Sequence, residues 1–567
     1  MAETVQTDPA TPRATDETPK RRRRDRWFRY TIPGLTVAVI LACLAFTPSL
    51  LPRSPFFQGA LCGVNAAIGY GLGVLGAWIW RAFADRDERV ASRTSYLVFT
   101  VIAAVSFVVS WIAGLYWQGQ VRDLMGSDED PVGLRLVLPL VAVLLFVALV
   151  AAGRGLRSLY HWIARQLDRW IGHRAAIAIG WAAVVGGLYL LISGVLAGYL
   201  VDLANQSFSV ANGITKEGVV RTTSDLRSGG PDSDVTWDSL GREGRSFVAG
   251  GPSPADIESW SGRDAEEPIR AYAGLESSDD AERRAGLAVE DLERMGGFDR
   301  EYLLVVTTTG SGWISPRAVD TFEYLTGGNS ATVGIQYSYL PSWISYLVDQ
   351  AKAREAGRDL FDAVYEKWSK LPIDDRPKLM LFGESLGTFG AEAAFSGEVD
   401  LANRTDGALL AGPPNFNTLY REFTDNREAG TPEIEPVFKD GRTVRVDDGK
   451  GIDPPPVGEP WDGPRVLYVA HPSDPIVYWS PRLMLHKPDW LREPRGRDVS
   501  PDMHWFPFVT FWQVSADLPG ATAVPSGHGH DYNIDYVDAW AQVLRPQDWT
   551  SAKRDSLQRI ILTEDTD

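Results

Sequence analysis

Apolar residues dominate the first third of the chain, and polar segments separate shorter apolar runs in the rest. Five early stretches carry no charged residue and approach or exceed the roughly 20 residues that a helix needs to cross a bilayer. They are residues 33–52, 55–80, 94–117, 136–153 and 175–201. Buried helices of a large soluble protein explain any one stretch, but five in succession favour membrane spans. We therefore predict a transmembrane domain of about five helices over residues 31–201, with the lipid bilayer as a partner.

Basic residues gather in alternate connections between these stretches. Residues 1–30 form a basic tail, and the connections after the second and fourth stretches are rich in arginine. No small-x-small cleavage site follows the tail, so we do not expect a cleaved signal peptide. Because basic connections stay in the cytoplasm, we predict a cytoplasmic N-terminus. An odd number of spans then places the chain after about residue 201 outside the cytoplasm.

The pattern changes after residue 201. Residues 202–267 are polar and rich in Gly, Ser and Asp, which predicts a linker that packs on the following domain. Apolar runs then alternate with amphipathic segments, as in a mostly parallel sheet with helices on both faces. The predicted strands are residues 268–273, 302–307, 331–337, 378–382, 407–411 and 465–470, and the predicted helices are 278–295, 359–371, 388–395 and a final one at 532–543. The long, polar, Pro-rich segment 415–463 is predicted to be a cap or lid insertion within the domain 268–567.

A nucleophile motif directly follows one predicted strand. The strand 378–382 runs into Gly383-Glu384-Ser385-Leu386-Gly387, and a helix of small residues comes next. Such a strand–turn–helix holds a serine in a strained conformation with its hydroxyl exposed at the sheet edge, and the small residues Gly383 and Gly387 permit the turn. The alternative is a plain strand-to-helix turn, but the strand before and the helix after favour Ser385 as a catalytic nucleophile.

A serine of this kind needs a histidine to take its proton and an acid to orient that histidine. Asp474 stands just past the strand 465–470, and a Gly-flanked pair of histidines, His528 and His530, precedes the last predicted helix. The chain order Ser, Asp, His is the one expected for this kind of elbow. We favour His530 slightly as the base because it is closer to the helix, and His528 remains the second candidate.

The transition state of acyl transfer also needs two backbone N–H donors for its oxyanion. One is predicted at Leu386, directly after the nucleophile. The other is predicted at Thr309 or Gly310, in the Gly-rich loop after the strand 302–307. A phosphate-binding loop is disfavoured there because no lysine follows at the required spacing.

Composition narrows the possible functions. The formal net charge of -17 argues against nucleic acid as a partner, since phosphate binding needs a basic surface. The two cysteines, Cys43 and Cys62, lie in apolar stretches, so no Cys-rich metal site is expected. His528-x-His530 lacks the further ligand cluster of a zinc site. We therefore expect no metal and no cofactor.

Several motifs together resemble one known family. These are Thr-Thr-Thr-Gly-Ser-Gly-Trp at 307–313, Gln-Tyr-Ser-Tyr-Leu-Pro-Ser-Trp at 336–343, the Gly-Glu-Ser-Leu-Gly elbow, His-Pro-Ser-Asp-Pro at 471–475 and Gly-His-Gly-His at 527–530. They are similar to the actinobacterial membrane-anchored α/β-hydrolase family with an N-terminal multi-span domain. The resemblance implies an α/β-hydrolase fold after a transmembrane bundle, and a serine hydrolase in a bacterial plasma membrane.

The leading hypothesis is therefore hydrolysis of an ester or thioester bond in a small acyl ester or a cell-envelope lipid. An acyltransferase would use the same three side chains with an acceptor alcohol in place of water. A non-catalytic membrane scaffold or transport component is the alternative from another class, and the order of the candidate triad argues against it. A metal-dependent hydrolase would retain activity without Ser385.

Overall fold

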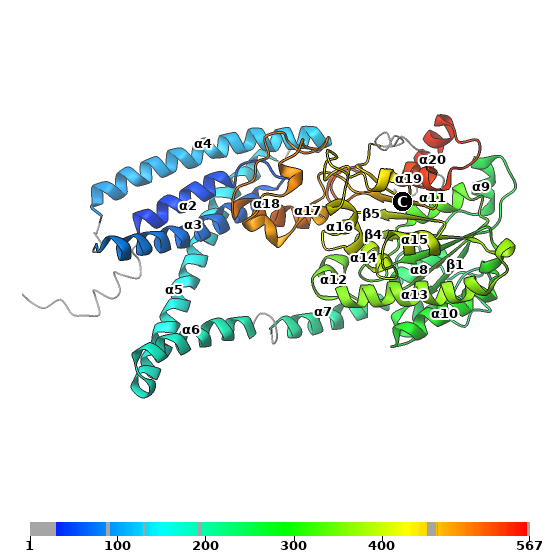
Figure 1. Cartoon of the computed structure of the whole chain (residues 1–567), viewed down its shortest axis with the longest axis horizontal. Helices are drawn as coiled ribbons and strands as arrows, with labels where there is room; N and C mark the ends of the chain where they lie inside the picture. Colours follow the sequence, from blue (N-terminus) through cyan, green and yellow to red (C-terminus); the bar gives the residue numbers. More distant parts are fainter. Residues whose placement is uncertain are drawn as a thin grey trace, which may run out of the picture.

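The computed structural model describes residues 30–86, 91–128, 131–190, 196–450, 461 and 463–563. It consists of a helical part and an α/β domain (Figure 1). The helical part contains α2 (Ile32–Leu44), α3 (Pro55–Ala84), α4 (Arg93–Met125), the short 3-10 helix η1 (Val132–Leu136), α5 (Val137–Ile171), α6 (His173–Leu190) and α7 (Leu196–Asn212). The predicted basic tail lies outside the described residues, except for its last position.

Two glycine pairs let α3 approach its neighbours closely. A Cβ built at Gly59 or Gly63 would lie 2.6 or 2.8 Å from a backbone oxygen of α5. A Cβ at Gly69 or Gly73 would lie 2.6 or 2.5 Å from a backbone oxygen of α2. Each pair has the four-residue spacing that brings helix backbones together in a membrane. The α3 helix therefore packs closely on α5 near its beginning and on α2 further along its length.

Three helices are long and apolar enough to cross a membrane: Pro55–Ala84, Arg93–Met125 and Gly133–Ile171. The prediction of five such spans is therefore too high for the described residues. The first predicted stretch yields only the 13-residue α2, because the chain turns after it and buries residues 49–51 against the α/β domain. The fifth covers most of α6 and the start of α7, where Ile177–Gly187 is a shorter apolar helix; residues 191–195 lie outside the described residues.

The α/β domain is built on a seven-stranded parallel sheet in the order β1-β3-β2-β4-β5-β7-β6. The strands are β1 (Ile269–Ala273), β2 (Tyr302–Thr307), β3 (Ser330–Ile335), β4 (Lys378–Glu384), β5 (Gly407–Ala411), β6 (Val444–Asp447) and β7 (Arg465–Val469). Strands β1 to β5 and β7 are almost completely buried, as expected for a sheet covered on both faces. The predicted fold class is confirmed.

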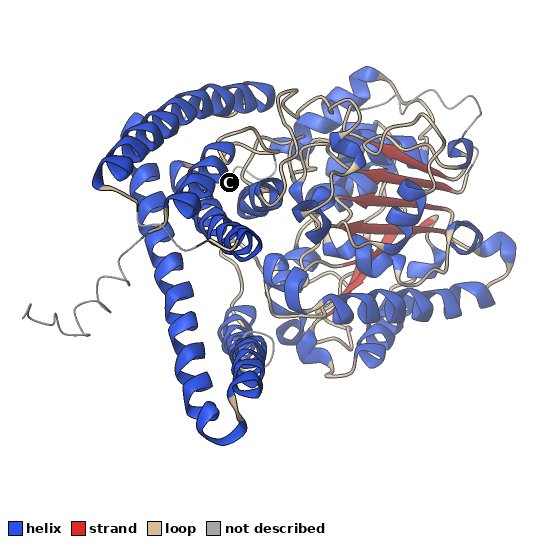
Figure 2. Cartoon of the chain, turned by 60° about the vertical axis from the view of Figure 1, so that its left-hand side comes forward, coloured by secondary structure: helices blue, strands red, loops and turns tan. Residues whose placement is uncertain are grey.

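Helices cover both faces of this sheet (Figure 2). On one face, α13 (Gln350–Lys370) packs between α10 (Ala281–Arg294) and α14 (Leu386–Glu392). On the other, α11 (Pro316–Leu325) packs on α19 (Tyr536–Leu544) and α20 (Ser551–Thr563). Neither α11 nor α20 was predicted. The helix predicted to be the last one corresponds to α19, and α20 follows it. The shorter helices are α12 (Ser342–Val348), α15 (Glu398–Arg404), α16 (Thr418–Asp425) and the 3-10 helices η4 (Leu275–Ser277), η5 (Gly297–Asp299), η6 (Ile373–Asp375) and η7 (Lys439–Gly441).

The segment 202–267, predicted as a linker, is ordered on the edge of the sheet. After α7 it forms η3 (Trp237–Leu240), α8 (Gly241–Ala249) and α9 (Pro254–Ser261). Backbone hydrogen bonds join it to β1: Ser228 N donates to Arg270 O, and Arg270 N donates to Leu226 O. The guanidinium of Arg270 is fully buried between Glu323 and Asp320, so two ion pairs also stabilise this edge of the sheet.

The segment 415–463, predicted as a cap, partly extends the sheet instead. Its strand β6 pairs with β7 along the outer edge, and α16 packs on α14. Only four residues long and flanked by charged residues, β6 leaves a weak pattern in the sequence. Residues 451–460 of this segment lie outside the described part of the chain.

The insertion that reaches the helical part lies between β7 and the histidine loop. It contains α17 (Pro475–Tyr478), η8 (Pro481–Met484), η9 (Asp489–Leu491), α18 (Val509–Asp517) and η10 (Leu518–Gly520). Val509 is buried in one cluster with Phe46, Leu61 and Leu138 of the helical part. The two parts of the chain therefore share a continuous packed interface.

A buried ion pair reinforces this interface. Arg53 Nε lies 2.9 Å from Asp517 Oδ1, and both side chains are almost fully excluded from solvent. Asp517 Oδ2 also accepts hydrogen bonds from Ser49 Oγ at 2.5 Å and from Leu50 N at 3.2 Å. The connection between α2 and α3 is therefore fixed to the C-terminal end of α18, four residues before Ala521, where the loop that carries both candidate histidines begins.

Candidate active site

Ser385 occupies a strained turn between β4 and α14. Its backbone has φ 54° and ψ -126°, a conformation that a residue with a side chain adopts only when its surroundings enforce it. Ser385 N donates to Ala411 O at 2.8 Å, and Thr388 N donates to Ser385 O at 3.0 Å. A Cβ at Gly387 would lie 2.4 Å from Thr307 O, and one at Gly383 would lie 2.7 Å from the Gly387 backbone. Both flanking glycines are thus required by close backbone contacts.

Asp474 is fully buried at the carboxyl end of β7, where it also begins α17. Its Oδ1 accepts a hydrogen bond from Ile476 N at 2.8 Å. Its Oδ2 accepts from Tyr532 Oη at 2.7 Å and lies 2.6 Å from His530 Nδ1. Three donors thus converge on one carboxylate, which fixes both its position and the orientation of the His530 ring.

The other ring nitrogen of His530, Nε2, is buried without a hydrogen-bond partner in the described part of the chain. The ring lies against the end of β5, since a Cβ at Gly412 would lie 2.6 Å from His530 Cε1. Ala411, the residue before Gly412, is the one whose carbonyl holds Ser385 N. Ser385 and His530 therefore lie beside two adjacent residues of the chain, and His530 Nε2 is available for a proton.

Two opposing effects set the pKa of His530. Burial lowers the pKa of His530. The charge and the hydrogen bond of Asp474, with a further contribution from the charge of Glu384, raise it by more than burial lowers it, so the pKa lies above its ordinary value. Glu384 itself accepts a hydrogen bond from Tyr536 Oη at 2.5 Å, and burial raises the pKa of its carboxyl group. A carboxylate pair thus favours the protonated form of this histidine.

His528 belongs to a different pair. Its Nδ1 lies 3.1 Å from Asp498 Oδ2, which also accepts a hydrogen bond from Ser473 Oγ at 2.5 Å. Ser473 Oγ in turn accepts from Gly529 N at 2.8 Å. The geometry thus separates the two histidines that the sequence left as alternatives: one contacts Asp474, and the other contacts an acid with no sequence motif around it.

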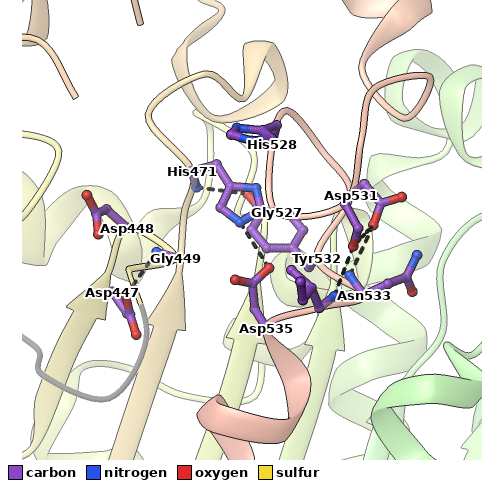
Figure 3. Close-up of polar contacts among 12 residues, drawn as sticks. Asp447, Asp448, Gly449, His471, Gly527, His528, Asp531, Tyr532, Asn533 and Asp535 are labelled. Atoms are coloured by element: carbon purple, nitrogen blue, oxygen red, sulfur yellow. Dashed lines mark hydrogen bonds and ion pairs between the residues drawn. The ribbon is translucent and has the colours of Figure 1, made fainter. Parts of the chain in front are cut away.

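A third histidine, His471, contacts the loop that carries His528 and His530. His471 is fully buried, with Nδ1 2.9 Å from Gly529 O and Nε2 3.0 Å from Asp535 Oδ2 (Figure 3). Its ring stacks on Tyr532, with centroids 4.2 Å apart. His471, Tyr532 and Asp498 were not predicted to be parts of the site. His471 and Tyr532 lie close in the sequence to Asp474 and His530, and this closeness is the only signal that could have indicated these two residues. No such signal points to Asp498.

The predicted oxyanion donors differ in availability. Leu386 is the first residue of α14, where N–H groups have no acceptor within the helix. The Thr309 N–H instead donates to Trp313 O at 3.0 Å, and the Gly310 N–H donates to Tyr337 Oη at 2.8 Å. The structure brings Leu386 to the elbow, but it engages the N–H groups of Thr309 and Gly310 elsewhere. The Thr309 N–H closes the turn of its own loop, and the Gly310 N–H joins that loop to Tyr337.

Aromatic rings extend from the nucleophile helix toward α12. Phe389 of α14 contacts Phe416, with ring centroids 4.8 Å apart, and Phe416 contacts Tyr346 of α12 at 5.0 Å. The same short helix exposes Trp343 and Leu347, with exposed fractions of 68% and 67%. An apolar surface thus begins next to the elbow and reaches the solvent.

Metal-binding geometry is not evident at this site. Among the described residues, no group of three or more His, Cys, Asp and Glu side chains is arranged to hold a metal ion. His528 and His530 in particular face separate carboxylates.

Comparison with known proteins gives matches to two sequence profiles. Residues 269–557 match the profile described as the alpha/beta-hydrolase family, and residues 46–252 match the profile of that family's N-terminus. No curated protein and no solved structure matches the chain. The first match covers more than half of the sequence and includes every strand of the sheet.

Proposed function

The chain belongs to the alpha/beta-hydrolase family, and from this premise we propose that it is a membrane-anchored serine hydrolase that cleaves ester or thioester bonds. The proposal rests on the strained Ser385, whose N–H donates to Ala411 O, and on the His530 ring, which lies against the adjacent Gly412. Asp474 orients this ring through Nδ1. A strained serine costs on the order of 1–3 kcal/mol and persists where surrounding contacts enforce it, often because function needs it.

The proposed reaction uses these groups in sequence. Ser385 Oγ attacks the substrate carbonyl while His530 Nε2 takes its proton, and Asp474 stabilises the resulting imidazolium. The Leu386 N–H donates to the developing oxyanion. His530 then gives the proton to the leaving alcohol or thiol, which departs and leaves an acyl-serine. Water attacks this ester with His530 again as the base, and the acid product and free serine are released.

We propose a substrate with an apolar acyl chain. The support is α12, which packs on the nucleophile helix α14 and exposes Trp343, Leu347 and Val348. A cluster of large apolar side chains on a surface usually marks a binding site. A lipid of the cell envelope fits this surface, since the helical part would hold the domain beside a bilayer.

The proposed membrane topology has the N-terminus in the cytoplasm and the α/β domain outside it, in a plasma membrane. The described ends of α3 and α4 nearest to residues 87–90 lie far from the sheet, whereas the connection between α2 and α3 contacts α18 (Figure 1). Arg154 lies 4.3 Å from the ring centroid of Tyr30, next to the basic tail. The position of Arg154 beside Tyr30 supports a cytoplasmic location for this end of the helices under the positive-inside rule.

Cysteine labelling in intact cells tests this topology. We expect Asp374→Cys, at an exposed position of the α/β domain, to react with a membrane-impermeant maleimide in intact cells. Arg86→Cys, at the exposed end of α3, should react only after permeabilisation. The unmodified chain gives the background, because Cys43 and Cys62 lie in apolar helices. The reverse labelling pattern would overturn the proposed orientation.

A fluorophosphonate probe tests the proposed activity. We expect the native protein to be labelled and the Ser385→Ala variant to be unlabelled, with acyl-ester hydrolysis reduced by a factor of about 10⁵–10⁶. A matched control is Ser396→Ala, which removes a hydroxyl at the far end of the same helix region, where Ser396 Oγ bonds only to Asp400. If native protein and Ser385→Ala were labelled equally, or only after heating, the serine hydrolase proposal would be wrong.

A further inference from the structure

The buried ring of His471 lies between two hydrogen-bond acceptors. Its Nδ1 is 2.9 Å from Gly529 O, and its Nε2 is 3.0 Å from Asp535 Oδ2 (Figure 3). A carbonyl oxygen can only accept a hydrogen bond, and so can an ionised carboxylate. A neutral imidazole has one N–H and one lone pair, so it can donate to only one of these two oxygens. The two contacts therefore require a proton on each side of the ring.

The proton between His471 Nε2 and Asp535 Oδ2 belongs to the ring. Histidine is the stronger base of the two, with an ordinary pKa of about 6.5 against about 3.9 for aspartic acid. Without this proton, one ring nitrogen would present its lone pair to an oxygen at 2.9 or 3.0 Å, and such a contact is repulsive. The geometry therefore indicates an imidazolium that donates from both nitrogens.

The surroundings of the ring also favour the protonated form. Burial lowers the pKa of His471, but the charge and the hydrogen bond of Asp535, with the bond to the backbone carbonyl, raise the pKa above its ordinary value. Gly449 packs on the edge of the ring, since a Cβ there would lie 2.6 Å from His471 Cδ2 and 2.8 Å from Arg497 Nη2. The ionisable groups around the ring and its partners are Asp447, Asp448, Arg497, Asp498, His530, Tyr532 and Asp535. Arg497 and a protonated His530 oppose the charge of the ring, but Asp535 contacts it directly and has the largest effect in its favour.

The bond from His471 Nδ1 fixes the peptide group that joins Gly529 to His530. The carbonyl oxygen of this peptide accepts from His471, and its N–H donates from His530 to Ala521 O at 2.7 Å. Because a peptide group is planar, bonds to both of its polar atoms set its orientation. They therefore also set the direction in which the His530 side chain leaves the backbone. Loss of the His471 bond would free one side of this peptide.

The same ring supports the acid that orients His530. It stacks on Tyr532 with the ring centroids 4.2 Å apart and the planes at 15°, and His471 N donates to Tyr532 Oη at 3.3 Å. Tyr532 Oη donates in turn to Asp474 Oδ2 at 2.7 Å, the oxygen that contacts His530 Nδ1. A cationic ring is attracted to the face of a tyrosine more strongly than a neutral ring. The protonated His471 thus contacts the supports of both His530 and Asp474.

We propose that His471 is a positioning residue that stays protonated during catalysis, and that loss of its proton at alkaline pH releases the catalytic histidine. The effect on the reaction rests on the proposed function. When the ring loses one proton, the Asp535 carboxylate keeps the remaining N–H, because a charge-assisted hydrogen bond is stronger than one to a carbonyl. The contact with Gly529 is therefore the one that breaks. Activity then has two limits, protonation of His530 in acid and deprotonation of His471 in alkali.

Nitrogen NMR of the full chain with ¹⁵N-labelled histidine rings tests the protonation state. We expect both ring nitrogens of His471 to carry a proton at about pH 7.5, where a histidine of ordinary pKa is about 90% neutral. The His471→Gln variant identifies its signals among those of the seven histidines of the chain. A neutral His471 ring at this pH would overturn the proposal, whether or not the chain hydrolyses esters.

The pH dependence of kcat tests the positioning role. His471→Gln presents an amide oxygen to one of the two acceptors, so kcat should fall about tenfold or more, and the loss of activity in alkali should disappear. Asp535→Asn supplies an amide donor to Nε2 of a neutral ring, so both contacts persist without the second proton. This variant should stay active to a higher pH than the native chain, whereas a merely structural role would predict a loss at every pH. His486→Gln, at an exposed position, is the matched control and should keep the native pH profile.

Amide hydrogen exchange separates this role from the hydrolase proposal. We expect the His530 amide to exchange faster in His471→Gln than in the native chain or in His486→Gln. Equal exchange in all three, or a native alkaline limit of kcat in both His471→Gln and Asp535→Asn, would overturn the positioning role. A native chain with a protonated His471 and a protected His530 amide that hydrolyses no acyl ester would refute the hydrolase alone.

Discussion

The Asp474→Asn variant should lose about 10⁴-fold in kcat, because the amide no longer stabilises the tautomer and the charge that His530 needs. Asp474 Oδ2 lies 2.6 Å from His530 Nδ1, and both side chains are buried. Asp498→Asn is the matched control, since Asp498 faces His528 at a similar distance of 3.1 Å. We expect Asp498→Asn to retain kcat within about tenfold. Steady-state hydrolysis of an acyl ester by both purified variants measures the difference.

The pH profile provides an independent check on the same assignment. The base must be neutral to take a proton, and the pKa of His530 lies above its ordinary value because Asp474 outweighs the effect of burial. Activity of the native protein should therefore fall as the pH decreases through a pKa above 6.5. The same fall should persist in His528→Gln. A larger loss in Asp498→Asn than in Asp474→Asn would instead identify His528 as the base.

The second large effect is expected for stability. Asp517→Ala should lower the free energy of unfolding by about 3–5 kcal/mol, because it leaves the buried guanidinium of Arg53 without its carboxylate. Ser49 Oγ and Leu50 N lose their acceptor as well. Thermal unfolding of the detergent-solubilised chain measures the effect as a lower Tm.

Two further variants distinguish the ion pair from general disturbance of the interface. Asp502→Ala removes an exposed acceptor of Trp117 Nε1 on the same interface, and it should change the Tm little. The double variant Arg53→Met/Asp517→Leu replaces both charges with apolar groups and should recover most of the lost stability. An unchanged Tm in Asp517→Ala would show that Arg53 finds another partner and that the pair is not essential.

Much of the α/β domain could be predicted from the sequence, because buried parallel strands are continuous apolar runs. Strands β2 and β5 have the predicted bounds, β1, β4 and β7 differ by one or two residues at one end, and β3 differs by one or two residues at both ends. The exception is β6, whose sequence Val-Arg-Val-Asp lies on the outer edge of the sheet. An edge strand needs few apolar residues, so its identity depends on the neighbour β7 rather than on its own pattern.

The candidate site was predictable where a residue's role depends on local sequence. The strand, turn and helix around Ser385 are consecutive in the sequence, so the local pattern of residues is enough to predict the strained turn. The choice between His528 and His530 depends on Asp498 and Asp474, which lie 30 and 56 residues away along the chain. Sequence spacing does not show which carboxylate meets which ring. Sequence spacing likewise does not show that the Gly310 N–H, one of the two predicted alternatives for the second oxyanion donor, donates to the distant Tyr337 hydroxyl.

The described residues contain fewer long apolar helices than the five predicted spans, and the first stretch shows why: an apolar run does not reveal what it contacts. Residues 45–52 are uncharged like the helix before them, yet Leu50 and Leu51 are buried with the α/β domain. An apolar run has the same hydropathy whether its side chains contact lipid or the interior of a protein. The chemistry of the neighbours, including Ser49 on Asp517, is what identifies this stretch as an interface.

The insertion between β7 and the histidine loop also limits how this domain can move. Leu51 of the helical part lies 3.3 Å from a Cβ built at Gly529, between the two candidate histidines. The α/β domain is therefore packed against the helical part and is not joined to it by a flexible linker alone. In any bilayer crossed by α3, α4 and α5, Ser385 stays at one height above the surface. The proposed hydrolase would therefore cleave only bonds that reach that height, whether by lateral diffusion or by extending outward.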